Sequence, residues 1–169
     1  RGSYRKTKRN ILSCPHDGVF LNMTLNTLNM REPASLVDEW KGKVQKISFG
    51  FHTPWKPRDP LWIPFGKARN EVIDELLRLK KKDPDFIFNT EGQLRTMMTG
   101  SWTKTCPAWF LRALDSSGRP KRCALGDTAI CGKCGVDCYA GISSALGGEM
   151  LEWVKNMTNL LLRPNPKRP

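Results

Sequence analysis

Two short segments decide the predicted fold: VFLNMTLN, residues 19–26, and VQKISFGFH, residues 44–52. Each alternates apolar and polar side chains with the period of two that is typical of a β-strand. The apolar members of the alternation are Leu21, Met23, Leu25, Ile47, Phe49 and Phe51. We therefore expect two neighbouring strands, each with one apolar face packed against helices.

The opposite face of each predicted strand is polar and lacks the Lys and Glu residues of ordinary solvated sheets. Its candidate ligand-binding side chains are Asn22, Thr24, Asn26, Ser48 and His52. A parallel sheet covered on both faces would have nearly continuous apolar strands, and unpaired buried polar groups are costly. The pattern predicts a sheet whose polar face lines a binding cavity. A two-layer sheet with this face in solvent is the alternative interpretation.

Helices alternate with strands along the first hundred residues. The apolar spacing and the breaking residues predict helices at 4–12, 32–40, 67–82 and 91–98, and a third strand at 85–89. The order of helix, strand, helix, strand, helix, strand, helix is typical of an α/β fold with a parallel sheet.

The pattern changes at residue 100, so we expect one unit at 1–99 and a C-terminal extension at 100–169. Residues 109–125, WFLRALDSSGRPKRCAL, predict a hairpin that turns at Ser-Ser-Gly. A last helix is expected from about residue 148 to 162. Its predicted buried stripe consists of Met150, Val154, Met157 and Leu161.

Composition limits the classes of partner. The chain has 169 residues, 39% of them hydrophobic, and a formal net charge of +12. That charge would suit a polyanion, but the basic clusters lie at chain ends and turns, so we do not expect nucleic acid as the partner. There is no run of roughly 20 apolar residues and no charged-then-apolar leader. We expect no membrane span and a cytoplasmic location, although the sequence starts at Arg1 rather than Met.

Five of the six cysteines have the spacing of metal ligands: Cys106, Cys123, Cys131, Cys134 and Cys138. The sixth, Cys14, lies far away in the sequence. Structural disulfides are disfavoured, because a chain of this size can bury a core without them and Cys-x-x-Cys makes a poor structural bridge. No His lies near, so the ligands would be all sulfur. Zinc and an iron–sulfur cluster both accept such a set, and the spacing alone leaves the two open.

The cysteine-rich part resembles the SPASM/twitch auxiliary-cluster module of radical S-adenosylmethionine (SAM) enzymes. The resemblance rests on the spacing of Cys106, Gly118 and Cys123 and on the hairpin between them. CGKCGVDCYAGISSAL, residues 131–146, also resembles the cysteine cluster that closes radical SAM proteins of the hopanoid-biosynthesis type. The full SPASM pattern has a longer gap before its later cysteines and one more cysteine downstream. The resemblance therefore implies one auxiliary [4Fe-4S] cluster rather than two.

The upstream part resembles the later strands and helices of the radical SAM partial barrel. The matching segments are FLNMTLNTLN at 20–29, ISFGFHTP at 47–54 and FNTEGQL at 88–94. The implied fold is the second half of a partial (β/α) barrel with a small cysteine-rich hairpin and helix module. The resemblance also implies that Asn22, Thr24, Asn26, Ser48 and His52 line the lumen where SAM and substrate meet.

One departure is serious, because the Cys-x-x-x-Cys-x-x-Cys loop that holds the family's SAM-binding cluster is missing. We expect that the chain lacks the first half of the barrel and is inactive alone. In the intact enzyme the resemblance implies a small-molecule or peptide substrate and a reductant such as flavodoxin or ferredoxin.

The rival hypothesis is a zinc-ribbon module that binds nucleic acid through its basic surface. It accounts for the charge and for four of the thiols. It does not account for the polar strand faces.

Overall fold

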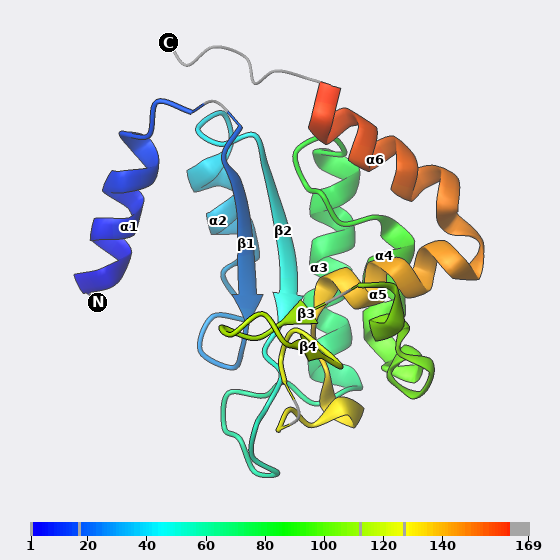
Figure 1. The fold of residues 1–169 in the computed structure, drawn as a ribbon. Helices are drawn as coiled ribbons and strands as arrows, with labels where there is room; N and C mark the ends of the chain where they lie inside the picture. Colours follow the sequence, from blue (N-terminus) through cyan, green and yellow to red (C-terminus); the bar gives the residue numbers. More distant parts are fainter. Residues whose placement is uncertain (1, 17, 112, 127, 163–169) are drawn as a thin grey trace.

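A computed structural model describes residues 2–16, 18–111, 113–126 and 128–162 of the chain. The elements before residue 100 are α1 (Gly2–Leu12), β1 (Phe20–Leu25), α2 (Pro33–Trp40), β2 (Lys46–Phe51), α3 (Lys67–Lys82) and α4 (Glu91–Thr99). The four helices and two of the three strands predicted for this region are therefore confirmed. In Figure 1, α1 stands at one side of the strand pair and α3 to α6 at the other.

β1 and β2 are parallel and adjacent, as predicted, and Asn22 lies opposite Ser48 in the register. The apolar face of β1 packs as expected, since Leu21 and Met23 contact the buried cluster of Leu36, Trp40 and Val44 that α2 and the following turn supply. A slip of one residue would reverse the two faces, so this packing holds the register.

The predicted third strand at 85–89 was wrong as a strand, because the structure gives it a single parallel bridge between Ile47 and Ile87. Two residues beyond this bridge, the side chain of Asn89 replaces backbone pairing with β2. The amide of Asn89 accepts a hydrogen bond from Phe49 N at 2.8 Å and donates one to Phe49 O at 3.0 Å. These two bonds satisfy the backbone of Phe49, so no further strand residue pairs there.

The C-terminal region holds the remaining elements. They are the short helical turns η1 (Ser101–Thr105) and η2 (Pro107–Phe110), the hairpin β3 (Ala113–Leu114) and β4 (Pro120–Lys121), the turn η3 (Cys131–Lys133), α5 (Asp137–Ser144), the π-helical turn η4 (Ala145–Glu149) and α6 (Met150–Leu162). The predicted hairpin is confirmed: Asp115 N donates to Arg119 O at 2.9 Å, and Gly118 has the positive φ of 80° that the turn requires. The short helix α5 was not predicted.

One hydrophobic core spans both regions of the chain. Buried residues of the strands and of α3 and α4 share it with Trp102, Cys134, Tyr139 and Ala140. The predicted boundary at 99/100 coincides with the end of α4, where Gly100 adopts the left-handed conformation. Across the described ranges the strands form two sheets of two strands each.

The predicted burial of the last helix was wrong at two positions, because Met150 is 42% exposed and Val154 is 46% exposed. α6 bonds to the rest of the molecule through Asn156, which donates to Phe88 O at 3.0 Å. The side chain of Leu161, also in the predicted stripe, lies outside the described residues. Within the described ranges, none of the helices combines the length and the apolar character needed to span a membrane.

Candidate metal centre

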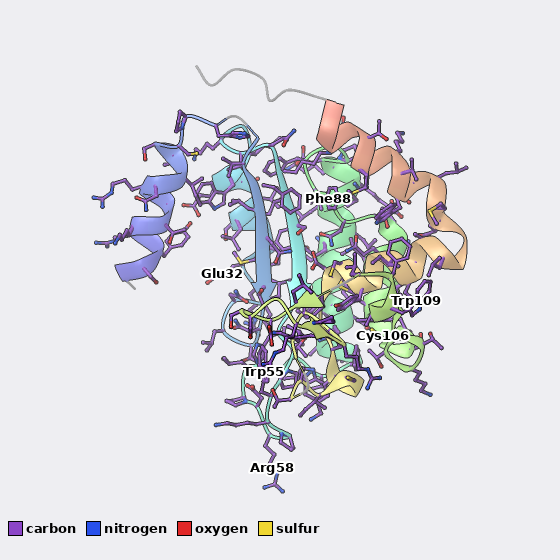
Figure 2. All side chains as sticks on the ribbon, viewed as in Figure 1. Glu32, Trp55, Arg58, Phe88, Cys106 and Trp109 are labelled. Carbon is purple, nitrogen blue, oxygen red and sulfur yellow. The ribbon has the colours of Figure 1, made fainter. Side chains whose placement is uncertain are left out.

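Four of the five predicted cysteine ligands line one cavity of about 1090 Å³: Cys106, Cys123, Cys131 and Cys134. They come from three separate segments of the C-terminal region, and Cys106 and Trp109 are labelled in Figure 2. Cys138 and Cys14 are not among the residues that line this cavity. None of the six cysteines, all of which lie in the described ranges, forms a disulfide bond.

Short local turns present these thiols. Cys106 stands between η1 and η2, and Pro107 starts the second turn. Cys123 follows β4, and its thiol accepts a hydrogen bond from Leu125 N at 3.4 Å. Cys131 begins η3 and Cys134 directly follows it, and Cys134 N donates to Cys131 O at 3.0 Å. Tight turns of this kind bring a Cys-x-x-Cys pair to one side of the chain.

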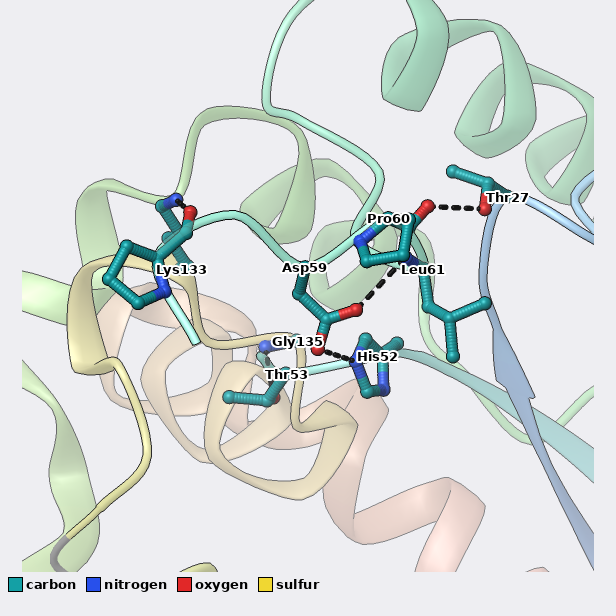
Figure 3. Close-up of polar contacts among 9 residues, drawn as sticks. Thr27, His52, Thr53, Asp59, Pro60, Leu61, Lys133 and Gly135 are labelled. Atoms are coloured by element: carbon teal, nitrogen blue, oxygen red, sulfur yellow. Dashed lines mark hydrogen bonds and ion pairs between the residues drawn. The ribbon is translucent and has the colours of Figure 1, made fainter. Parts of the chain in front are cut away.

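The loop that carries Cys134 is fastened to the C-terminal end of β2. Thr53 Oγ1 donates to Cys134 Sγ at 3.9 Å and accepts a bond from Gly135 N at 2.8 Å, and the contact between Thr53 and Gly135 is drawn in Figure 3. Gly135 O in turn accepts from Phe51 N at 2.8 Å. A Cβ at position 135 would lie 2.2 Å from Phe51 O. Only glycine allows this close approach.

Burial raises the pKa of the Cys106 and Cys134 thiols above the ordinary value. The other cavity cysteines raise both values further, because several thiolates in one cavity repel each other. Tyr139, which is buried beside them, accepts a bond from Ala124 N at 3.2 Å through its hydroxyl. A metal group would have to displace the thiol protons, so its binding would release protons.

Cys138 differs from the other four candidate ligands. It lies in the first turn of α5 and the residue is exposed. Partial desolvation and the carboxylate of the neighbouring Asp137 raise the pKa of its thiol to about 11.

The other cavity-lining side chains are a mixture of apolar and basic groups. Trp102, Leu111 and Leu125 form apolar walls, and the exposed cations Lys104, Lys121 and Arg122 stand at the border. In the part of the chain that the structure describes, no three side chains of His, Cys, Asp or Glu are grouped closely enough to hold one metal ion.

Two of the five predicted lumen residues meet each other and a third, unpredicted residue. Asn22 Nδ2 donates to Ser48 Oγ at 2.7 Å and to Asp137 Oδ2 at 2.9 Å. Ser48 Oγ donates to the same carboxylate oxygen at 3.1 Å. Burial raises the pKa of Asp137, and these hydrogen bonds oppose the shift. The sequence signal for Asp137 was its position as an acidic residue inside the cysteine run.

The remaining three predicted lumen residues are placed separately. Thr24 is exposed on β1. Asn26 begins the turn after β1, and its side chain accepts a bond from Leu28 N at 2.8 Å. His52 Nε2 lies 3.0 Å from Asp59 Oδ2 on the following loop, as Figure 3 shows. The hydrogen bond from His52 lowers the pKa of Asp59. Of the five predicted lumen residues, Asn22 and Ser48 therefore contact each other, and the other three lie at separate positions.

In comparisons with known proteins, no family model matches the chain, and no curated protein or solved structure matches it significantly.

Proposed function

We propose that the four-cysteine cavity binds an auxiliary [4Fe-4S] cluster, in a chain that corresponds to the second half of a radical SAM partial barrel and its C-terminal module. The observation that carries the proposal is the common cavity of Cys106, Cys123, Cys131 and Cys134, which come from three segments of the chain. Four thiolates are the usual ligand set of such a cluster.

The residues present fit this group in chemistry. All four donors are sulfur, and the described residues that line the cavity include no His. One zinc ion, with Zn–S bonds of about 2.3 Å, requires its ligands to crowd around one point. A four-iron cluster spreads four sulfurs around a larger body, which suits thiols on the walls of an open cavity. Bound there, such a cluster supplies one-electron transfer or an iron site that can bind substrate.

The strand pair supports the partial barrel. β1 and β2 are parallel, their polar residues Asn22 and Ser48 share a face, and Asp137 of the cysteine module binds both. Asp137 therefore links the polar strand face to the segment that also carries Cys134. We propose that His52, just past the C-terminal end of β2, belongs to the SAM and substrate side. Polar groups at that end of the strands are typical of barrel sites.

Anaerobic reconstitution with iron and sulfide tests the cluster. We expect about four irons and four sulfides per chain and a broad absorption near roughly 400 nm that dithionite bleaches. Cys106→Ser should lower the iron content, whereas Cys14→Ser, the matched control outside the cavity, should not. Stoichiometric zinc without iron uptake would instead support the zinc-ribbon hypothesis.

The barrel assignment has its own tests. A Cys-x-x-x-Cys-x-x-Cys loop encoded upstream of Arg1 would support it. In an intact relative, replacing the residue equivalent to His52 by Ala should weaken turnover and leave the auxiliary-cluster spectrum unchanged. Loss of that spectrum would contradict the assignment of His52 to the SAM side.

A further inference from the structure

The cavity that the four cysteines line also has the size and the walls of a small-molecule site. Its volume is about 1090 Å³, and the sites of small ligands typically measure roughly 300–1,000 Å³. Besides the sulfurs, its lining contains the buried ring of Trp102 and the half-buried side chain of Leu125. Such a space can enclose an apolar group of a ligand.

The segment between Cys106 and the hairpin leaves large apolar side chains exposed at this cavity. Trp109, labelled in Figure 2, lines the cavity and is 74% exposed, and Leu111 also lines it and is 40% exposed. The ring of Trp109 packs edge-on against Phe110, which is itself exposed. Exposed apolar groups bordered by charged ones commonly mark a binding site. An exposed indole at the cavity can pack against the planar apolar body of a ligand.

The charged side chains at the cavity have a single sign. Among the described residues that line it, the charged ones are Lys104, Lys121 and Arg122, and none is a carboxylate. Asp115, in the hairpin turn, is already bonded to Arg119, whose Nε lies 3.0 Å from Asp115 Oδ2. A cleft lined by charges of one sign concentrates their field and attracts the opposite charge. The cavity therefore favours anions.

We propose that this cavity binds a small organic anion with a planar apolar body, with the body against Trp109 and Leu125 and the anionic group at Lys121 and Arg122. The inference goes beyond the proposed function and does not rest on it, because it needs the walls and charges of the cavity and no metal. Exposed cations alone hold an anion weakly, since water and salt screen them. Burial of the apolar body supplies affinity, and the cations select the sign of the charge.

The experiment uses two fluorescent probes, 8-anilinonaphthalene-1-sulfonate and N-phenyl-1-naphthylamine, which share one apolar body and differ in the sulfonate group. Each becomes more fluorescent in an apolar environment, so titration of the metal-free protein, kept reduced with dithiothreitol, gives a dissociation constant and a stoichiometry. We expect one saturable site per chain for the sulfonate probe. Its affinity should fall as sodium chloride is raised, whereas that of the neutral probe should not. Wild type without a saturable site for the sulfonate probe would overturn the inference.

The double variant Lys121→Gln/Arg122→Gln tests the charges. It should weaken binding of the sulfonate probe about tenfold and leave the neutral probe unchanged, because only the sulfonate interacts with the two cations. Lys81→Gln/Lys82→Gln is the matched control, since it removes two adjacent exposed cations of α3 that do not line the cavity and lowers the net charge by the same amount. Equal weakening in both double variants would show that the net charge of the protein, and not the cavity, attracts the probe, and would overturn the inference.

Trp109→Ala tests the apolar wall. It should weaken both probes about tenfold, because both share the apolar body. Trp55→Ala, at a tryptophan that is 47% exposed and does not line the cavity, is the control and should weaken neither. Unchanged binding in Trp109→Ala would overturn the placement of the ligand. Iron uptake is measured separately, so probe binding without iron uptake would overturn the proposed function alone, and iron uptake without a probe site would overturn this inference alone.

Discussion

Asp137 Oδ2 accepts a hydrogen bond of 2.9 Å from Asn22 Nδ2, although 115 positions separate the two residues in the chain. The bond joins the first strand of the sheet to the start of α5, one residue before Cys138. Gly50 of β2 lies under the same contact, since a Cβ there would meet Asp137 at 3.4 Å. The cysteine module thus contacts the polar face of the strand pair at Asn22, Ser48 and Gly50, whereas Thr24 on the same face stays exposed.

Asn22→Ala should destabilise the protein by about 0.5–1.5 kcal/mol, because it removes both donated bonds, although Asn22 itself is exposed. Urea unfolding with a fluorescence readout measures the change. Thr24→Ala is the control on the same face of β1. Thr24 is exposed like Asn22, but its side chain has no hydrogen bond to a described residue, so the expected change is below about 0.5 kcal/mol. Equal effects of both variants would contradict a structural role for the Asn22–Asp137 contact.

Gly135→Ala should destabilise the protein by about 1–3 kcal/mol, because the added Cβ would lie 2.2 Å from Phe51 O and would force the loop of Cys134 away from β2. Both the unfolding free energy and the iron uptake should fall. At Gly132, three residues earlier, a Cβ would meet nothing within 4 Å. Gly132→Ala should therefore behave like wild type, and a loss as large as that at Gly135 would show that the close contact with Phe51 is not the cause.

Cys138→Ser should keep the full iron and sulfide content after anaerobic reconstitution, whereas Cys131→Ser should lose it. The reason is that Cys131 lines the common cavity and Cys138 does not. Iron and sulfide assays, with electron paramagnetic resonance of the dithionite-reduced protein, measure the outcome. A cluster retained in Cys131→Ser and lost in Cys138→Ser would reverse the assignment of the fourth ligand.

Glu39→Gln should reduce the acid sensitivity of the protein. Lys8 and Tyr4 of α1 both donate hydrogen bonds to the Glu39 carboxylate, and the bond from Lys8 is the largest cause of its lowered pKa. A carboxyl whose pKa is lower in the folded state stabilises the fold above its unfolded pKa, and this stabilisation is lost as the pH falls through the folded value. Since Tyr4 and Lys8 are partly exposed, we expect a contribution below about 1 kcal/mol.

Urea unfolding at neutral pH and at about pH 3.5, a value below the ordinary pKa of Glu, measures this loss. The difference in unfolding free energy between the two conditions should be smaller in Glu39→Gln than in wild type. Glu71→Gln, at an exposed position of α3, is the control and should keep the wild-type difference. An unchanged difference in Glu39→Gln would contradict a role for this carboxyl in docking α1.

Local patterns were sufficient to predict most of the elements. The alternation in residues 19–26 and 44–52 predicted two strands and which side of each is apolar, because side chains in a strand alternate between its faces. The helix at 67–82 and the hairpin turn at Ser116–Gly118 were likewise predicted from periodicity and turn residues, which act over a few positions. The cysteine spacing indicated a candidate metal site, but it gave five candidate cysteines for a site that needs four ligands.

Only the tertiary structure decided which long-range contacts form. Packing of the cysteine module against β2 placed Cys131 at the cavity, left Cys138 outside its lining, and brought Asp137 to Asn22 and Ser48. The bonds of Asn89 with Phe49 replace further strand pairing at residues 85–89, and the enclosure of Arg69 leaves its guanidinium without a hydrogen bond to any described residue. Such contacts depend on how distant segments fill one core, and the periodicity of a short segment carries no information about the segment that will pack against it.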